Sequence, residues 1–261
     1  MRGVPILMYH QVSSHPLPGF EKYTVAPRAF AAQMRWLARA GYVSVSIDAL
    51  LAARAGGPAL PHRAVVITFD DGFVEAVEHA APVLQALGMT AVFFLVAGLM
   101  GGTSAWLRAE RGIELPLIDW GTARELCATG FICGAHSVSH PRLAELPSAA
   151  RRDELRRSRA MLEGGLGRRV DHLAYPYGSY DAEVRVAAAD AGFRSACSVR
   201  IGLSGPDDDA LALHRVPVTG GDGLADFICR VRTGRAAGEL LQRKALGAWR
   251  ALRSLVAADA G

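Results

Sequence analysis

The feature that most constrains the fold is a regular alternation of short apolar runs with segments of helical periodicity. The apolar runs, each expected to be a strand, are residues 4–9, 43–47, 65–69, 91–96, 131–135, 172–175, 195–199 and 211–216. Helices are expected over residues 27–41, 73–86, 120–129, 151–162 and 181–191. Strands that alternate with helices form parallel βα units, so the sequence predicts an α/β fold, either a barrel or a doubly wound sheet.

The segments between these elements predict loops and a single large domain. Residues 52–62 are rich in glycine and proline, and residues 98–117 show no clear periodicity, so both are expected to be irregular. Gly164 and Gly165 are expected to break the helix that begins at Arg151. The sequence contains neither an internal repeat nor a linker long enough to separate two domains of comparable size.

Composition excludes several classes of protein. Of the 261 residues, 51% are hydrophobic and 21% are charged, which is typical of a globular chain that buries its own core. Four cysteines without a C-x-x-C pair argue against a disulfide framework. We find no secretion signal and no run of eighteen apolar residues. These features predict a cytoplasmic protein.

Polar residues follow several of the apolar runs directly. They are His10, Asp70 and Asp71, His136, and the pair Pro176 and Tyr177. Because the carboxyl ends of parallel strands share one face, where active sites are built, we expect these side chains to converge.

Asp70 and Asp71 stand between a predicted strand and Gly72. Neighbouring side chains of a strand point to opposite sides, but a turn at Gly72 would let both carboxylates reach one cleft. One would then bind a metal ion while the other accepts a proton from water. The alternative is a strand-to-helix turn in which Asp71 caps the following helix.

His136 and His140 are four residues apart, and Pro141 follows them. This spacing lets both imidazoles face one ion, from a loop and not from a helix, because the residue before a proline avoids helical backbone. Two histidines and one aspartate are a common ligand set for a catalytic divalent cation. The alternative is two polar loop residues. Nearby, Tyr177 is either a donor of a free backbone N–H to an oxyanion or an aromatic residue that packs the rim.

The ordered set of these motifs resembles the polysaccharide deacetylase family, the carbohydrate esterases with a NodB homology domain. The matching segments are TFDDG at residues 68–72, HSVSHP at 136–141 and YPYG at 175–178, within a resemblance that covers residues 4–218. The opening LMYHQV at residues 7–12 and the helix around residues 30–42 resemble the branch that includes poly-N-acetylglucosamine deacetylases.

The resemblance implies a NodB-like, distorted (β/α) barrel of about seven parallel strands. It also implies one divalent metal, zinc first and cobalt, nickel or manganese as alternatives, with Asp71, His136 and His140 as ligands. Asp70 would be the general base, and the Tyr177 N–H would hold the oxyanion. The implied reaction removes an N-acetyl or other N-acyl group from an amino sugar in a polysaccharide, oligosaccharide or lipid-linked glycan.

The sequence departs from the family pattern in two respects. An arginine that orients the base often opens the third motif, but Ala174 stands there, so Arg215 is expected to supply the charge from another strand. The general acid is also open between His10 and His214. We favour His10, because it ends a strand on the expected active face; either histidine is equally compatible with a core position.

The C-terminal segment is strongly basic, with seven basic residues and one acid between Arg230 and Arg253. We therefore expect a catalytic domain over residues 1–225 and a basic amphipathic helical extension over residues 226–261. The apolar stripe of this extension comprises Leu241, Ala245, Trp249, Leu252 and Val256. Such a helix either lies on an anionic membrane at the inner surface or packs against the barrel with its basic side in water.

Two other functions are compatible with parts of the pattern. Adjacent aspartates after a strand also occur in metal-dependent nucleotide-sugar glycosyltransferases, although these give no reason for His136 and His140. A barrel that binds a glycan without hydrolysing it is the second alternative. Nucleic acid is not an expected partner, because the basic cluster lacks interleaved aromatic residues or a known motif.

Overall fold

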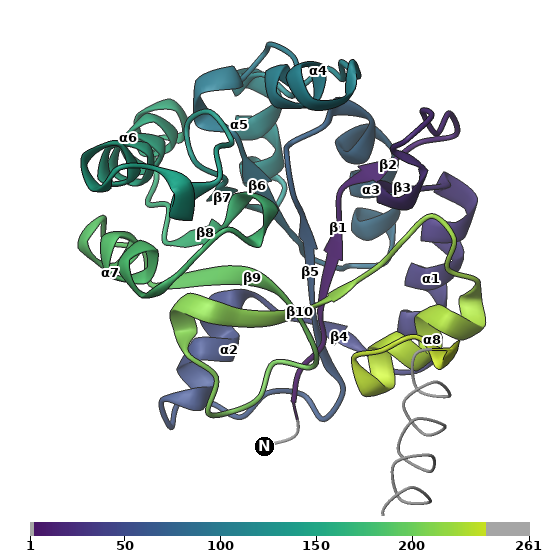
Figure 1. Cartoon of the computed structure of the whole chain (residues 1–261). Helices are drawn as coiled ribbons and strands as arrows, with labels where there is room; N and C mark the ends of the chain where they lie inside the picture. The colour runs from purple at the N-terminus through teal and green to yellow at the C-terminus, as the bar shows by residue number, and fades with distance from the viewer. Residues whose placement is uncertain (1–2, 239–261) are drawn as a thin grey trace, which may run out of the picture.

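The computed structural model describes residues 3–238, and its centre is a closed barrel of parallel strands (Figure 1). The strands of the barrel are β1 (Ile6–Tyr9), β5 (Ala64–Phe69), β6 (Val92–Leu95), β7 (Ile132–Ala135), β8 (His172–Ala174), β9 (Ser195–Ile201) and β10 (Leu213–Pro217). The ring closes because β1 pairs in parallel with both β5 and β10. The predicted α/β fold is therefore confirmed, and it is the barrel of about seven strands.

Three short strands lie outside this ring. β4 (Val43–Ser44) pairs with the beginning of β5, whereas β6 pairs with the end of β5. β2 (Gln11–Val12) pairs with β3 (Thr24–Val25) in a separate two-stranded sheet. These strands extend the barrel wall without interrupting its closure.

Helices surround the ring on its outer side, as Figure 1 shows. They are α1 (Pro27–Arg39), α3 (Val74–Ala86), α5 (Trp120–Ala128), α6 (Ser148–Leu166), α7 (Ala182–Asp190) and α8 (Leu224–Thr233). Short 3-10 turns occur at Glu21–Tyr23, Ala97–Leu99, Leu143–Glu145, Pro176–Gly178 and Ala210–Ala212. Among the helices of residues 3–238, none is long and apolar enough to cross a bilayer.

Two helices occupy segments for which we expected something else. The predicted strand at residues 43–47 ends at Ser44, and α2 (Ile47–Arg54) follows, because the Ser46 hydroxyl accepts the Ala49 N–H and caps the helix. The predicted loop at residues 98–117 contains α4 (Ala105–Arg111). Both helices are only two turns long, too short for an apolar period to be recognised.

The predicted break at Gly164 and Gly165 was also wrong. Helix α6 continues through both residues and ends before Gly167, which has a φ of 66°. A Cβ at Gly165 would lie 2.2 Å from the Trp120 ring. This glycine therefore allows α5 and α6 to pack closely, and that packing outweighs the low helix propensity of glycine.

The apolar core is divided by the strands into an inner and an outer cluster. The inner cluster contains Ile6, Val66, Val92, Phe94, Ala174, Cys197 and Leu213 of the barrel strands. Ile47 and Leu50 of α2 belong to the same cluster, so α2 closes one end of the barrel. The outer cluster joins the alternate strand residues, such as Leu7 and Phe69, to the surrounding helices. This division follows from the alternation of side chains along each strand.

The predicted domain boundary between residues 225 and 226 falls inside α8. Phe227 of this helix is fully buried, and its ring contacts Trp36 of α1 with 5.9 Å between ring centroids. The beginning of the predicted extension is therefore packed on the barrel. The predicted stripe from Leu241 to Val256 lies outside the described residues.

Substitution of Gly134 by alanine should destabilise the barrel. A Cβ at this position of β7 would lie 2.5 Å from the Phe94 ring and 3.0 Å from the His172 carbonyl oxygen. We expect a loss of about 1–3 kcal/mol in the free energy of unfolding, measured in urea. Gly164→Ala is the matched control, since its Cβ meets no atom within 4 Å and should be neutral or stabilising. Equal effects of the two substitutions would contradict this account.

Candidate active site

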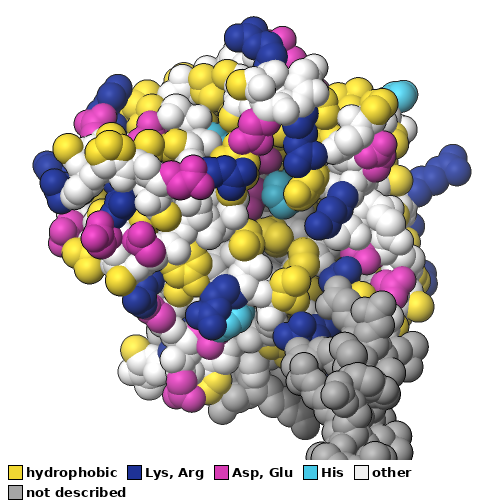
Figure 2. Space-filling view, viewed as in Figure 1, with side chains coloured by type: hydrophobic (Ala, Val, Ile, Leu, Met, Phe, Trp, Pro, Cys, Tyr) yellow, Lys and Arg dark blue, Asp and Glu magenta, His cyan; other side chains and the backbone are white. Residues whose placement is uncertain are grey.

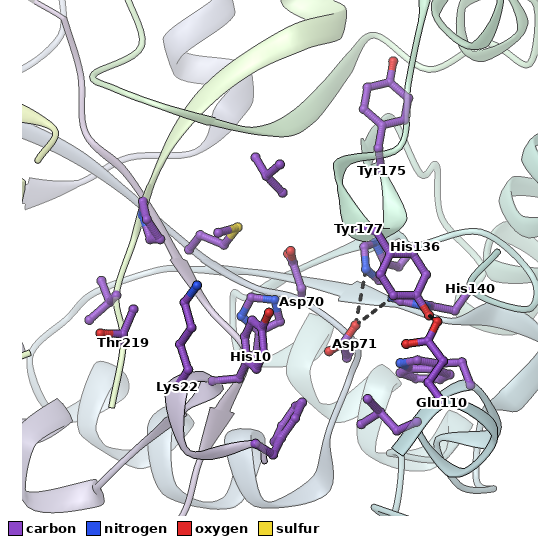
Figure 3. A pocket seen from close by; sticks show the side chains of 18 of the residues that line it. His10, Lys22, Asp70, Asp71, Glu110, His136, His140, Tyr175, Tyr177 and Thr219 are labelled. Atoms are coloured by element: carbon purple, nitrogen blue, oxygen red, sulfur yellow. Dashed lines mark hydrogen bonds and ion pairs between the residues drawn. The ribbon is translucent and has the colours of Figure 1, made fainter. Parts of the chain in front are cut away.

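The carboxyl ends of the strands open into a cleft of about 490 Å³. Figure 2 shows it as a hollow in the surface with a histidine visible inside, and Figure 3 shows the side chains that line it. Of the predicted site residues, the cleft is lined by His10, Asp70, Asp71, His136, His140 and Tyr177. The expected convergence of the strand ends is therefore confirmed.

Asp71, His136 and His140 form a compact cluster of metal-ligating types. The Oδ1 atom of Asp71 lies 3.3 Å from Nε2 of His136 and 3.2 Å from Nε2 of His140. All three residues are buried, and one ligand atom from each lies within 4.8 Å of the others. They come from the turn after β5 and the loop after β7, two strands that flank β6 in the barrel (Figure 3).

In both histidines, Nε2 is the ring nitrogen that faces Asp71. Nδ1 of His136 lies 2.8 Å from the Ala174 carbonyl oxygen, to which it donates. Nε2 of His136 therefore carries the lone pair in the neutral ring. Nδ1 of His140 is buried without a hydrogen-bond partner among the described residues, so its Nε2 is the nitrogen with a polar neighbour. Two imidazoles and one carboxylate aimed at one point fit a divalent cation.

The backbone at this cluster is strained. Within residues 3–238, four residues other than glycine have a positive φ, and all of them lie in the turns of the cleft. They are Asp71 (77°), Ser137 (63°), His140 (63°) and Tyr177 (57°). Such conformations cost of order 1–3 kcal/mol each and persist where the surrounding structure enforces them, typically at functional sites.

Asp70 is held by a fully buried arginine. Nη1 and Nη2 of Arg215 donate to the two carboxylate oxygens of Asp70 at 2.7 Å each, and Nε donates to the Ser198 carbonyl oxygen. Although burial alone would raise the pKa of Asp70, the charge and hydrogen bonds of Arg215 hold it below its ordinary value. Arg215 thus lies where the sequence predicted it, and its catalytic role stays a prediction.

The two candidate general acids lie in different places. His10 lines the cleft, where burial lowers its pKa and the charges of Asp71 and Asp70 oppose that effect. His214 does not reach the cleft; its Nδ1 lies 2.7 Å from Oδ2 of Asp208 in a separate surface hollow. Because side chains alternate along β10, an inward Arg215 places His214 on the other side of the strand.

Tyr177 lies against His140, with 4.5 Å between ring centroids. Its hydroxyl donates to Oε1 of Glu110 at 2.7 Å, and the Arg142 guanidinium lies 4.1 Å over its ring. On the opposite side, Trp106 stacks on His140 at 4.3 Å. Burial raises the pKa of Tyr177, and the hydrogen bond to Glu110 adds to this effect.

Helix α4 contributes to the site, which the sequence did not predict. Trp106 and Glu110 belong to this helix, in the segment that we expected to be a loop. The available signal was the run AWLRAER at residues 105–111, which consists mainly of good helix formers.

The barrel, the buried Asp–His–His cluster and the adjacent ion-paired aspartate define a (β/α)-barrel hydrolase. The sequence profile of the family described as polysaccharide deacetylase matches residues 57–196, more than half of the chain, and the chain belongs to this family. That membership confirms the predicted family and enzyme class, and it argues against the glycosyltransferase alternative.

Two curated relatives are similar in sequence. YxkH of Bacillus subtilis, which carries the name of a polysaccharide deacetylase, is 28% identical over 220 residues, or 84% of this chain and 72% of YxkH. The poly-β-1,6-N-acetyl-D-glucosamine N-deacetylase of Escherichia coli K12 is 38% identical over 125 residues. That match spans 48% of this chain but only 17% of the E. coli protein.

Solved structures show the same fold. IcaB of Ammonifex degensii superposes with a TM-score of 0.70 at 29% identity, over 83% of this chain and 92% of IcaB. The deacetylase PplD of Streptococcus pyogenes, solved with acetate, has a TM-score of 0.76 over 88% of this chain and 98% of PplD. At 21% identity, the second likeness concerns the fold alone.

Removal of the Arg215 side chain should destabilise the protein in a pH-dependent way. Arg215→Ala leaves a buried carboxylate unpaired, which costs about 3–5 kcal/mol in the free energy of unfolding near pH 7. The pKa of Asp70 is lower in the folded wild type than in the unfolded chain. The ion pair therefore contributes its full stabilisation above the pKa that Asp70 has in the unfolded chain, and this stabilisation is lost as the pH falls through the pKa that Asp70 has in the folded protein. The difference between variant and wild type should therefore shrink in acid.

Urea unfolding at several pH values measures this effect. Arg200→Ala, at an exposed position on β9, is the control and should change stability little at any pH. If Arg215→Ala loses as little free energy of unfolding as Arg200→Ala, the ion pair has no structural role.

The ligand cluster predicts that the purified chain binds one divalent cation. Asp71→Asn and His140→Ala should each weaken zinc binding by about tenfold or more, because each removes one of three ligand atoms. Metal content after gel filtration and calorimetric titration with zinc measure the effect. His214→Ala should retain wild-type affinity, and a similar loss in that variant would contradict the assignment.

Proposed function

We propose that this protein is a metal-dependent N-deacetylase that hydrolyses the N-acetyl group of an amino sugar in a polysaccharide or oligosaccharide. The observation that carries the proposal is the cluster of Asp71, His136 and His140 beside the ion-paired Asp70 in one cleft. Membership of the polysaccharide deacetylase family supports it. The 38% identity to a segment of the E. coli poly-N-acetylglucosamine deacetylase supports the choice of sugar.

The three ligands favour zinc, with cobalt, nickel or manganese as alternatives. When bound, such a cation supplies Lewis acidity that polarises the acyl carbonyl and lowers the pKa of a water molecule. Asp71, His136 and His140 would hold it, and the Ala174 carbonyl oxygen keeps the His136 ring in the required tautomer.

Asp70 is the proposed general base. Its depressed pKa keeps the carboxylate ionised, and the two hydrogen bonds from Arg215 fix its orientation. The carboxylate takes a proton from the attacking water, whose oxygen forms the new bond to the acyl carbon. Arg215 stays charged throughout and positions the base without touching substrate.

His10 is the proposed general acid, because it lines the cleft and His214 does not. Its imidazolium gives a proton to the amide nitrogen as the carbon–nitrogen bond breaks, so that the amine leaves in a neutral form. The Tyr177 backbone N–H is the proposed donor to the oxyanion that forms on the acyl oxygen. Acetate and the free amino sugar are the products.

A lipid-linked glycan is a narrower version of this proposal, and its support is the basic sequence from Arg230 to Arg253. Most of that segment lies outside the described residues. The cytoplasmic location, with contact to the inner membrane surface as its extension, likewise stays a prediction.

Acetate release from chitooligosaccharides tests the proposed reaction. Chelation should abolish release, and zinc or cobalt should restore it. Asp70→Asn should lower kcat by about 10²–10⁴-fold, because an amide cannot accept the proton of water, and His10→Ala should lower it by a comparable factor. A coupled assay for acetate gives the rates.

His214→Ala is the control for the choice of general acid and should keep most of the activity. Equal losses in His214→Ala and His10→Ala would contradict the assignment of the acid. If the metal-loaded wild type releases acetate from no amino-sugar substrate, the protein is the glycan-binding barrel named as an alternative.

A further inference from the structure

The rim of the cleft carries cationic side chains without acidic partners. Lys22, Arg111 and Arg142 line the cleft, and among the described residues none of the three forms an ion pair with a carboxylate. Figure 2 shows basic side chains around the hollow, and Figure 3 shows Lys22 reaching into it beside His10. The rim therefore presents unneutralised positive charge to a bound substrate.

The carboxylates of the cleft offset this charge only in part. Asp70 is paired with Arg215, and Asp71 faces the two histidines. Glu110 accepts the hydroxyl hydrogen bond of Tyr177 and is the remaining acid of the cleft. Three cations without a carboxylate partner thus face two acids without a cationic partner, Asp71 and Glu110, and a divalent cation at the Asp–His–His cluster would raise the positive charge of the opening further.

Lys22 and Arg111 converge on one aromatic ring. The Lys22 ammonium and the Arg111 guanidinium each lie 5.8 Å from the centroid of the Tyr23 ring. That ring packs on His10, with 5.0 Å between centroids. The Gly19 carbonyl oxygen accepts a hydrogen bond from Arg111 and holds the guanidinium in place. Two cations are thus gathered next to the proposed general acid.

This arrangement is unfavourable for a neutral polymer that is deacetylated many times. Each cycle converts a neutral amide into an ammonium group, and a positive cleft repels a chain that accumulates such groups. A substrate that carries its own negative charge is attracted instead of repelled. Its oxyanion interacts favourably with the cationic rim and offsets the charge of the new ammonium group.

Resting on the proposed deacetylase function, we infer that the cleft selects an amino sugar that bears an oxyanion, a phosphate or a carboxylate, bound by Lys22 and Arg111 over Tyr23. Both side chains donate charge-assisted hydrogen bonds to such a group, and Arg111 has the planar geometry for a bidentate pair. These two residues act on specificity and have no part in proton transfer.

Acetate release from three kinds of substrate tests the inference. They are neutral chitooligosaccharides, phosphorylated N-acetylglucosamine such as the 1-phosphate and its nucleotide diphosphate, and glycan fragments with carboxylate-bearing N-acetylmuramic acid. The wild type should favour an anionic substrate in kcat/KM by about tenfold or more, and added salt should reduce that preference. The phosphate and carboxylate arms distinguish the two sources of the oxyanion.

In the double variant Lys22→Gln/Arg111→Gln, the ratio of kcat/KM for anionic over neutral substrate should fall to about one. Arg108→Gln is the matched control, because Arg108 belongs to the same helix α4 but pairs with Glu114 and does not line the cleft. An equal kcat/KM for neutral and anionic substrates, or a preference that survives in the double variant, would overturn the inference.

Binding separates failure of this inference from failure of the proposed function. Calorimetry on Asp70→Asn, with N-acetylglucosamine and its 1-phosphate as ligands, measures selection without turnover. Tighter binding of the phosphate that depends on Lys22 and Arg111 upholds the inference even if the wild type releases no acetate. Equal binding of both ligands overturns it even if deacetylation is observed.

Discussion

The pairing of β1 with both β5 and β10 is the constraint on which the site depends. It closes the ring, so that every carboxyl end of the parallel strands faces one opening. The register opposes Tyr9 to Phe69, and the Asp70 N–H donates to the Tyr9 carbonyl oxygen. His10 and Asp70 are thereby brought together, although sixty residues of chain separate them. Without this closure, Arg215 on β10 and Asp70 directly after β5 would lie at opposite edges of an open sheet.

A ring of seven strands leaves a narrow interior, and its contents change along the barrel axis. At the end closed by α2, small and medium apolar residues surround the Phe94 ring, for which Gly134 leaves room. Towards the cleft, the interior contains the buried Asp70–Arg215 pair, of which Arg215 is fully removed from water and Asp70 reaches the cleft. A buried guanidinium must be paired and hydrogen-bonded. Arg215 therefore both stabilises the barrel and fixes the orientation of the Asp70 carboxylate.

The sequence predicted the strands and the site segments well, because strand ends followed by polar residues are local features. The metal-ligating set and the approach of Arg215 to Asp70 followed from the motifs and their resemblance to a family. The preference for His10 over His214 as general acid rested only on the position of His10 at a strand end. For His214, alternation along β10 indicates only that its side chain and that of Arg215 point to opposite sides of the strand. Closure of the ring decides which of them faces inward. Helix α4 was missed because tertiary contacts, not periodicity, stabilise so short a helix.

Asp70 and Asp71 are adjacent in sequence but lie in different environments, because the backbone conformation changes between them. Asp70 keeps the strand alternation and points inward, whereas Asp71 has a φ of 77° and turns towards the histidines. Both carboxylates are buried, so their mutual repulsion would be severe in a medium of low dielectric constant. Arg215 neutralises Asp70, and a divalent cation at the Asp–His–His cluster would neutralise Asp71. The strained turn thus places the proposed proton acceptor and the proposed metal ligand in one dipeptide on the same side, whereas a regular strand would separate them across the barrel wall.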